Sequence, residues 1–274
     1  MTGRILSPEA SLRSEPASQC REASECAPAR QTERARTDLM AMVSHDLRTP
    51  LAAIKEALSL LSETAGGRLE ERQRRYLTIA REEIDRLNRM IDNLIEVSRM
   101  DSGKVILHCD ALDLPELLSA AIESLSPLVS KRNLTVERNI PSRLPPVMGD
   151  RDRLLQALIN LMDNAIKYTP PGGTIRVGIE LVDPGARVLT ERGILANTGY
   201  VQVTVSDEGN GIPTELLDRI FGKFERVDPH VPGIGLGLAI VRSIVEMHHG
   251  KVWAESTLGK GTRFHFILPT KESS

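Results

Sequence analysis

The stretch MAMVSHDLRTPLAAIKEALSLL, residues 40–61, decides the first half of the fold. Its apolar positions recur at alternating spacings of four and three, which places them along one side of an α-helix. The stripe consists of Met40, Ser44, Leu47, Leu51, Ile54, Leu58 and Leu61. The glycine pair at 66–67 ends the pattern, so the sequence predicts a long amphipathic helix followed by a short turn.

A second stripe of the same kind follows this turn. It consists of Leu77, Ala80, Ile84, Leu87, Ile91, Leu94 and Ser98. Two such helices joined by a short turn form an antiparallel hairpin. A single hairpin leaves part of its apolar surface in water, and a second copy of the chain would cover it in a dimeric four-helix bundle. The alternative is an ordinary hairpin that packs against its own chain.

The pattern changes after Asp101-Ser102-Gly103 to short strands and helices with glycine-rich connections. Alternating apolar residues predict strands at 104–109, 133–138, 175–179, 201–205 and 264–268. Helical spacing predicts helices at 115–130, after the N-cap residue Asp150, and at 236–248 with Gly250 as its C-cap. Residues 183–199 lie between two strands and predict an extended hairpin loop. The mixture indicates a two-layer α/β sandwich with helices on one face of a sheet.

These patterns divide the chain into three parts and give an α+β fold. Residues 1–30 are rich in Ser, Glu, Ala, Arg and Pro without an apolar period, which predicts a disordered tail. The helical hairpin occupies residues 31–104, and the α/β domain occupies residues 105–274.

The composition excludes several classes of function. A net charge of −2 argues against a nucleic-acid partner, and 3% aromatic residues argue against a base-stacking surface. Three scattered cysteines form no disulfide framework or zinc site, which suits a reducing cytoplasm. No apolar run reaches the roughly 18 residues that a membrane span requires. We therefore expect a soluble, cytoplasmic chain.

The string SHDLRTPL, residues 44–51, places His45 one position outside the apolar stripe, where solvent reaches it. A neutral imidazole nitrogen is nucleophilic near pH 7 and is a good phosphoryl acceptor. Asp46 can accept the ring proton or hold the tautomer. Pro50 has no N–H group, so we expect a kink in the helix beside the histidine. A surface His–Asp pair on a coiled coil is the alternative for these two residues taken alone.

A polar stripe marks the predicted helix after Asp150. Asn160, Asn164 and Lys167 are spaced at i, i+4 and i+7 and therefore share one face of an otherwise apolar helix. Amide oxygens are hard ligands suited to Mg²⁺, and a lysine supplies positive charge to phosphate. An ordinary exposed polar face is the alternative.

Two glycine-rich segments follow. DEGNGIP, residues 207–213, comes directly after a strand, so that a buried Asp207 can accept the amine of adenine while the glycines permit close approach. GIGLGL, residues 233–238, precedes a helix, where its amides can face phosphate. Neither a Rossmann fingerprint nor a Walker loop fits the second segment. Between them, residues 221–233 have the composition of a mobile lid.

In this order the segments resemble sensor histidine kinases of two-component systems. The string around His45 is similar to their phosphoacceptor box, although Glu is commoner there than Asp46. The later segments, with the final glycine box at 259–262, are similar to the ATP-binding domain of the gyrase, Hsp90, histidine kinase and MutL superfamily. The resemblance covers about residues 37–270 and implies a Bergerat-type fold for the α/β domain.

The resemblance implies a role for named residues, with ATP and Mg²⁺ as cofactors. His45 would accept the phosphoryl group, with Asp46 and Thr49 as the other catalytic residues, and Asn160 and Asn164 would bind the metal. The nucleotide-binding residues would be Asn160, Asn164, Lys167, Tyr168, Asp207, Gly209, Gly211, Phe224, Arg226, Gly233, Gly235, Gly237, Leu238 and Thr262. Hydrolases of the superfamily carry a Glu base at the position of Asn160, and an amide cannot deprotonate water. The resemblance therefore implies transfer to a protein.

The implied partners are a second copy of the chain and the receiver domain of a response regulator, whose aspartate takes the phosphoryl group from His45. Three alternatives remain. The first is a phosphatase-dominant regulator, which would use Thr49 to orient water. The second is a catalytically silent scaffold that binds nucleotide only to change shape, and the third is an ATP-driven clamp. The intact His45 and Asn164 oppose the scaffold, and Asn160 opposes the clamp.

The remaining histidines show no metal-ligand spacing, and we expect them at surface or strand positions. They are His108, His230, His248, His249 and His265. The single tryptophan, Trp253, is expected in the core.

Overall fold

The computed structural model describes residues 51–52, 54–61, 70–102, 105–141, 143–192, 194, 199–228, 231 and 235–270. Its named helices are α2 (Glu71–Asp101), α3 (Leu114–Lys131), α4 (Arg151–Tyr168), α5 (Arg187–Glu191), α6 (Gly237–Met247) and the 3₁₀ turn η1 (Thr214–Leu216). Its strands are β1 (Asp110–Leu112), β2 (Thr135–Asn139), β3 (Val147–Gly149), β4 (Thr174–Val182), β5 (Tyr200–Asp207), β6 (Lys251–Thr257) and β7 (Gly261–Pro269).

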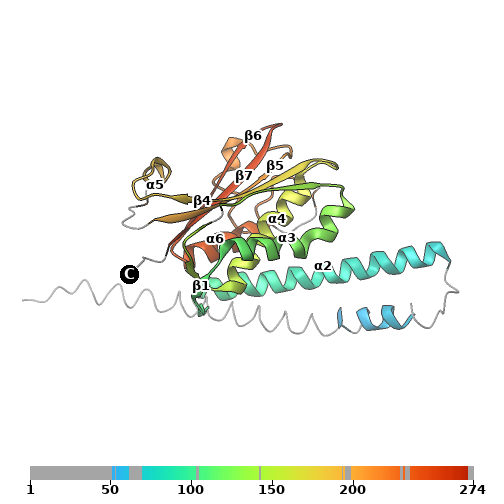
Figure 1. The fold of residues 1–274 in the computed structure, drawn as a ribbon. Coiled ribbons are helices and arrows are strands. Elements are labelled where there is room, and N and C mark those ends of the chain that lie inside the picture. Colours follow the sequence, from blue (N-terminus) through green and yellow to red (C-terminus); the bar gives the residue numbers. More distant parts are fainter. Residues whose placement is uncertain are drawn as a thin grey trace, which may run out of the picture.

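The two helices of the predicted hairpin lie side by side (Figure 1). Residues 51–52 and 54–61 are helical and run along α2. Leu51, Ile84 and Ile91 form a small buried cluster between them, as the two stripes predict. The beginning of the first stripe, Met40 to Leu47, and the residues His45, Asp46 and Thr49 lie outside the described residues.

Part of the apolar surface of the hairpin is exposed in the single chain. Ile54, Leu61 and Leu87, all members of the predicted stripes, are among its exposed large apolar side chains. Exposure of such a stripe is unfavourable in water, so this surface suits contact with a second copy. None of the described helices has the length and apolar character needed to cross a membrane.

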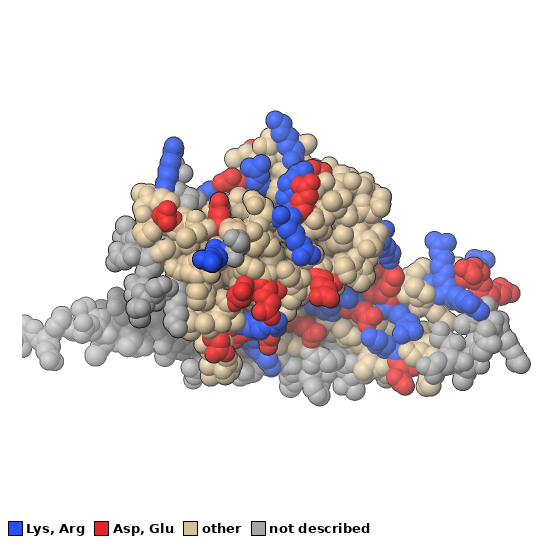
Figure 2. All heavy atoms as spheres, in the orientation of Figure 1, with Lys and Arg blue, Asp and Glu red and all other residues tan. Residues whose placement is uncertain are grey.

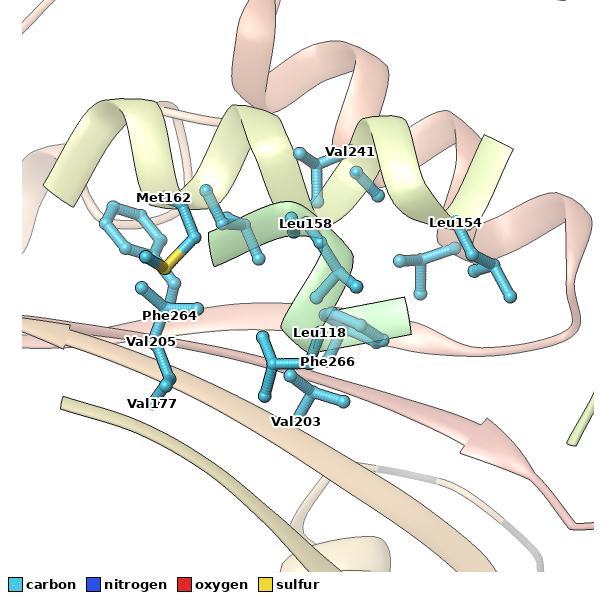
Figure 3. Packing of buried hydrophobic residues seen from close by; sticks show 14 of the residues in the cluster. Leu118, Leu154, Leu158, Met162, Val177, Val203, Val205, Val241, Phe264 and Phe266 are labelled. Carbon is cyan, nitrogen blue, oxygen red and sulfur yellow. The ribbon is translucent and has the colours of Figure 1, made fainter. Parts of the chain in front are cut away.

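The α/β domain is a two-layer sandwich, as predicted. Its main sheet has the strand order β2-β4-β5-β7-β6, in which only the β2–β4 pair is parallel. Helices α3, α4 and α6 cover one face of this sheet (Figure 1). Figure 3 shows the core between the layers, where side chains from the strands meet side chains from the helices: Val177, Val203, Val205, Phe264 and Phe266 against Leu118, Leu154, Leu158, Met162 and Val241.

Helix α2 belongs to both parts of the molecule. Near its C-terminal end, Val97 is buried in the main core of the α/β domain. On the preceding residue, the carboxylate of Glu96 accepts hydrogen bonds from Arg153 and Gln156 of α4. The hairpin is therefore fixed against the α/β domain along the last turns of α2.

The strand predicted at 104–109 is wrong. The structure has no strand at residues 105–109, and β1 begins only at Asp110. Its partner β3 pairs with it from Asp110 to Leu112 alone. The backbone N–H of His108 instead donates to the Asp150 carboxylate, so this segment makes a side-chain contact in place of a ladder bond.

The capping role predicted for Gly250 is also wrong. His249 is the residue that adopts the left-handed conformation after α6, with φ of 58°. Its N–H donates to Glu246, and the N–H of Gly250 donates to Val245, which together close the helix in a Schellman motif. Gly250 is required for another reason, because a Cβ there would lie 2.1 Å from the carbonyl oxygen of Ile267.

His248 does not lie on the surface as expected. It is 4% exposed, and its Nε2 accepts a hydrogen bond from the N–H of Asp150 at 2.9 Å. Its Nδ1 lies 2.7 Å from the carbonyl oxygen of Ile244, so the proton resides on Nδ1. Asp150 in turn caps α4 by accepting from the N–H of Arg153, as predicted. His248 therefore joins the end of α6 to the beginning of α4.

The segment 183–199 connects the adjacent antiparallel strands β4 and β5, which confirms the predicted hairpin. It contains the short helix α5 (Figure 1). Leu189 of α5 packs with Val182, Trp253 and Ile267 in a second small cluster. This cluster is separate from the core between the sheet and the helices. Trp253 is therefore buried as expected, but in this separate cluster.

Candidate functional site

A cavity of about 580 Å³ opens at the end of β5, between α4, α6 and α2. It brings together most of the residues that the sequence assigned to a nucleotide site. Those that line it are Asn160, Asn164, Lys167, Tyr168, Asp207, Gly211, Arg226, Gly235, Gly237, Leu238 and Thr262. Segments separated by about a hundred positions in the sequence therefore converge on one hollow.

Asp207 is the last residue of β5 and is 5% exposed. Its Oδ1 accepts hydrogen bonds from the N–H groups of Gly209 at 2.8 Å and Thr262 at 3.3 Å. Among the residues that the structure describes, no donor reaches Oδ2. Burial raises the pKa of the Asp207 carboxyl to about 6, because the two backbone donors only partly offset the loss of hydration. Asp207 is thus a buried carboxylate with one oxygen free for a ligand.

The backbone is packed too closely around Asp207 for ordinary side chains. A Cβ on Gly261 would lie 2.0 Å from the carbonyl oxygen of Asp207, and Gly261 has φ of 94°. A Cβ on Gly209 would lie 2.7 Å from Oδ1 of Asp207 and 2.9 Å from the carbonyl oxygen of Tyr168. Gly209 does not itself line the cavity, but its N–H orients the carboxylate that does.

The polar face of α4 forms a second wall. Asn160, Asn164 and Lys167 are half-buried and line the cavity together, as their spacing predicts. Asn160 donates a long hydrogen bond of 3.4 Å to the carbonyl oxygen of Gly237. Lys167 forms an ion pair with Asp163, a cavity residue that the sequence analysis did not single out. Its signal was its spacing, since Asp163 lies at i+3 from Asn160 on the same helix.

The segment before α6 folds back on itself. The N–H of Phe224 donates to the carbonyl oxygen of Gly235, and Arg226 donates to the carbonyl oxygen of Val231 at 2.7 Å. Gly235 has φ of 73°, and a Cβ there would lie 2.5 Å from the carbonyl oxygen of Glu225. Arg226 and Gly235 therefore reach the cavity wall.

Phe224, which the resemblance assigns to nucleotide binding, is not among the residues that line the cavity, and its role stays a prediction. The residue is 58% exposed, and its backbone adopts the left-handed conformation, with φ of 64°. Gly233, also predicted for this site, lies outside the described residues.

Helix α2 supplies a wall that the sequence analysis missed. Arg86, Arg89, Met90, Asp92 and Asn93 line the same cavity as the polar face of α4. The spacing of these residues predicts that most of them share one face of α2. Nothing local in the sequence indicates which part of the chain that face contacts. The cavity is therefore formed by both parts of the chain.

Two family models match the chain. The model described as "His Kinase A (phospho-acceptor) domain" matches residues 35–103. The model described as "Histidine kinase-, DNA gyrase B-, and HSP90-like ATPase" matches residues 149–272, which include α4, α6 and the strands β4 to β7. The chain belongs to the histidine kinase family. Most of the cavity lining lies within the residues matched by the ATPase model, and the α2 wall lies within those matched by the phospho-acceptor model.

Relatives of this chain include adaptive-response sensory kinase SasA of Synechococcus sp. (strain JA-2-3B'a(2-13)), with 38% identity over 234 residues. That match covers 84% of the chain and 58% of the relative. Sensor histidine kinase WalK of Bacillus subtilis (strain 168) is 32% identical over 244 residues, which cover 88% of the chain and 38% of the relative. The chain thus spans less than two thirds of the length of both curated relatives.

A solved structure supports the same fold. Full-length ShkA in complex with AMPPNP matches with a TM-score of 0.70 and 29% identity, over 86% of this chain and 46% of ShkA. That neighbour binds an ATP analogue. Acinetobacter baumannii histidine kinase AdeS matches with a TM-score of 0.56 at 23% identity, which supports the fold alone.

Proposed function

We propose that this histidine kinase binds Mg-ATP in the cavity, phosphorylates its own His45 and passes the phosphoryl group to an aspartate of a response regulator. The observation that carries the proposal is the convergence of Asp207, Asn164 and Gly237 on one cavity. An adenine acceptor, an amide ligand for a metal and a helix N-terminus together suit a nucleoside triphosphate.

Asp207 is the residue we assign to adenine. Its Oδ2 is free to accept the exocyclic amine, while the bonds to Oδ1 hold the carboxylate in place. The hydroxyl of Thr262 lies 3.0 Å from that of Ser256 and lines the cavity beside Asp207. Discrimination follows from chemistry, because a buried acceptor rejects a base that presents a carbonyl in place of the amine.

The other wall suits the triphosphate. Asn160 and Asn164 would hold Mg²⁺ through their amide oxygens, and the bound ion would neutralise charge on the phosphates. Lys167 would add a positive charge after leaving Asp163, and this half-exposed ion pair is weak enough to exchange. The amides of Gly237 and Leu238 at the start of α6 can face a phosphate.

The transfer step needs little covalent chemistry from the protein. A ring nitrogen of His45 attacks the terminal phosphorus, the bond to the bridging oxygen breaks, and ADP leaves with the electron pair. Asp46 takes the proton of the other ring nitrogen. The regulator's aspartate then attacks the same phosphorus, the bond from phosphorus to the His45 nitrogen breaks, and Asp46 returns the proton so that neutral imidazole is restored. Asn160 cannot deprotonate water, which favours transfer to His45 over hydrolysis.

Further parts of the proposal concern assembly and location. The exposed stripe of the hairpin supports a homodimer, and Thr49 is assigned to the dephosphorylation of the regulator. The division into a tail at 1–30, a phosphotransfer hairpin at 31–104 and an ATP-binding domain at 105–274 is retained. The exposed free thiol of Cys109 fits a cytoplasmic setting.

The test is labelling with γ-labelled ATP. His45→Gln should abolish labelling and leave nucleotide affinity within about twofold, because every nucleotide residue lies on the other domain or on α2. His108→Gln is the matched control, since this exposed imidazole lies outside the cavity, and its labelling should equal that of the wild type. A label that persists in His45→Gln and survives acid would identify another acceptor and refute the proposal. Binding without any labelling of the wild type would favour the silent scaffold.

A further inference from the structure

We propose that Arg86 and Arg89, on helix α2 of the hairpin, bind the phosphates of the nucleotide held by the ATP-binding domain. The inference rests on the proposed function, because it requires a phosphate-bearing ligand in the cavity. It adds two nucleotide-binding residues that lie outside the domain matched by the ATPase family model.

The geometry begins with the face of α2. Arg86, Met90 and Asn93 are spaced at i, i+4 and i+7, with Arg89 beside them, and all four line the cavity. Asn164 and Lys167, the residues assigned to the metal and phosphates, line the same cavity from α4. The two arginines therefore share a hollow with the phosphate-binding wall.

This face of α2 is fixed in place by its contacts. Val97, one turn beyond Asn93, is buried in the core of the α/β domain. Glu96 is bound by Arg153 and Gln156 of α4, and burial raises the pKa of its carboxyl despite these donors. Because α2 is anchored within about two turns of Arg89, the face of the helix that carries Arg86 and Arg89 is held against the cavity.

The charged residues that line the cavity show why positive side chains from α2 would favour phosphate binding. Without α2, the charged residues of the lining are two cations against three carboxylates: Lys167 and Arg226 against Asp163, Asp207 and Glu225. Such a lining is poorly suited to a polyanion. Helix α2 adds Arg86 and Arg89 and one carboxylate, Asp92, which brings the lining to four of each sign. Figure 2 shows positive and negative side chains interspersed on the visible face.

Both guanidinium groups are free to turn to a ligand at small cost. Arg86 pairs with Glu83 one turn away at 3.2 Å, and both side chains are substantially exposed, so the pair is weak. The charge of Arg89 helps to lower the pKa of Asp85, but Lys55 is the main partner of that carboxylate. Arg86 donates to Glu83 from Nη1 alone, at 3.2 and 3.5 Å, whereas a guanidinium can donate two parallel hydrogen bonds from two nitrogens to a phosphate.

The consequence is that phosphates tie the hairpin to the ATP-binding domain. A ligand with phosphates touches both parts of the chain, whereas adenosine touches only the Asp207 end. Docking of α2 therefore strengthens nucleotide binding, and the nucleotide strengthens docking by the same factor.

The experiment is titration calorimetry on the full chain with Mg-ATP, Mg-ADP and adenosine as probes. The double variant Arg86→Gln/Arg89→Gln should bind Mg-ATP about tenfold or more weakly and Mg-ADP more weakly as well, with adenosine within twofold of the wild type. Arg86→Lys/Arg89→Lys keeps the charge but loses the paired guanidinium donors, so its affinity for Mg-ATP should lie between those of the wild type and the Gln double variant. Arg75→Gln is the matched control, since this exposed arginine of α2 does not line the cavity, and it should change nothing.

Amide exchange provides the second measurement. Mg-ADP, but not adenosine, should slow exchange in residues 86–93 of the wild type. Equal Mg-ATP affinity in the wild type and the Gln double variant would overturn the inference, and so would an equal loss for adenosine, which would indicate a structural role. Failure of the site itself is distinguishable, because Asp207→Asn would then bind all three probes as the wild type does.

Discussion

Replacing Asp207 by Asn should stabilise the unliganded protein while it weakens ATP binding. The carboxyl is buried, and its pKa is raised from 3.8 to about 6. A tenfold change in proton affinity corresponds to about 1.36 kcal/mol, so keeping Asp207 ionised costs the wild-type fold about 3 kcal/mol at neutral pH. An Asn at this position carries no charge, and its amide oxygen can still accept from Gly209 and Thr262.

The sign and the pH range follow from linkage. Because the folded pKa of Asp207 lies above the unfolded one, the contribution of this carboxyl to stability is greatest below about pH 3.8 and falls until the pH passes about 6. The advantage of Asp207→Asn should therefore approach about 3 kcal/mol at pH 7.5 and be about half of that at pH 5. The amide presents an N–H₂ group where Oδ2 stood or gives up the bonds at Oδ1, so ATP affinity should fall at least about tenfold.

Urea unfolding of the two proteins at both pH values, followed by circular dichroism, measures the first effect, and calorimetric titration measures the second. A variant that is no more stable than the wild type at pH 7.5 would refute the burial argument. A stability gain that is the same at pH 5 and pH 7.5 would refute its electrostatic origin. Unchanged ATP affinity would remove Asp207 from the adenine site.

Three other substitutions probe separate parts of the molecule. Thr49→Ala should leave labelling of His45 nearly intact but slow the loss of label from a phosphorylated regulator, because a hydroxyl can orient water without being needed for the kinase step; equal rates of loss would assign Thr49 a structural role. Asn164→Asp should abolish autophosphorylation, since the new carboxylate repels the triphosphate and alters the metal ligands; a labelled variant would contradict this. Gly261→Ala should lower the free energy of unfolding by at least about 2 kcal/mol, because its Cβ meets the Asp207 backbone, and an unchanged urea midpoint would show that the strands can separate there.

Local periodicity accounts for the parts of the fold that the sequence predicted. The stripes of the hairpin, the capped helix α4 and the alternation of β4, β5 and β7 all depend on residues a few positions apart, so each can be detected without knowing the tertiary structure. The glycine boxes were equally visible, since the close approach at Gly261 leaves glycine as the residue that fits. Their convergence on one cavity came from the resemblance, because spacing alone does not bring Asn164 beside Asp207.

The errors arose where a distant contact decides the structure. The segment at 105–109 looks like a strand, but Asp150 takes the N–H of His108. His248 was expected at a surface or strand position, and nothing near it in the sequence indicates that its ring accepts a hydrogen bond from the N–H of Asp150. The α2 wall of the cavity was missed for the same reason. A helix face can be identified from its spacing, whereas the partner of that face is set by the whole fold.

The position of Trp253 makes its intrinsic fluorescence a probe of the 183–199 segment. It is the only tryptophan of the chain, its ring stacks on His265 at 5.1 Å, and the guanidinium of Arg192, in the 183–199 segment, lies 4.9 Å from its centre. It does not line the cavity. Its emission spectrum therefore follows the seating of that segment on the sheet, and a partner that lifts the segment would shift the spectrum without any added dye.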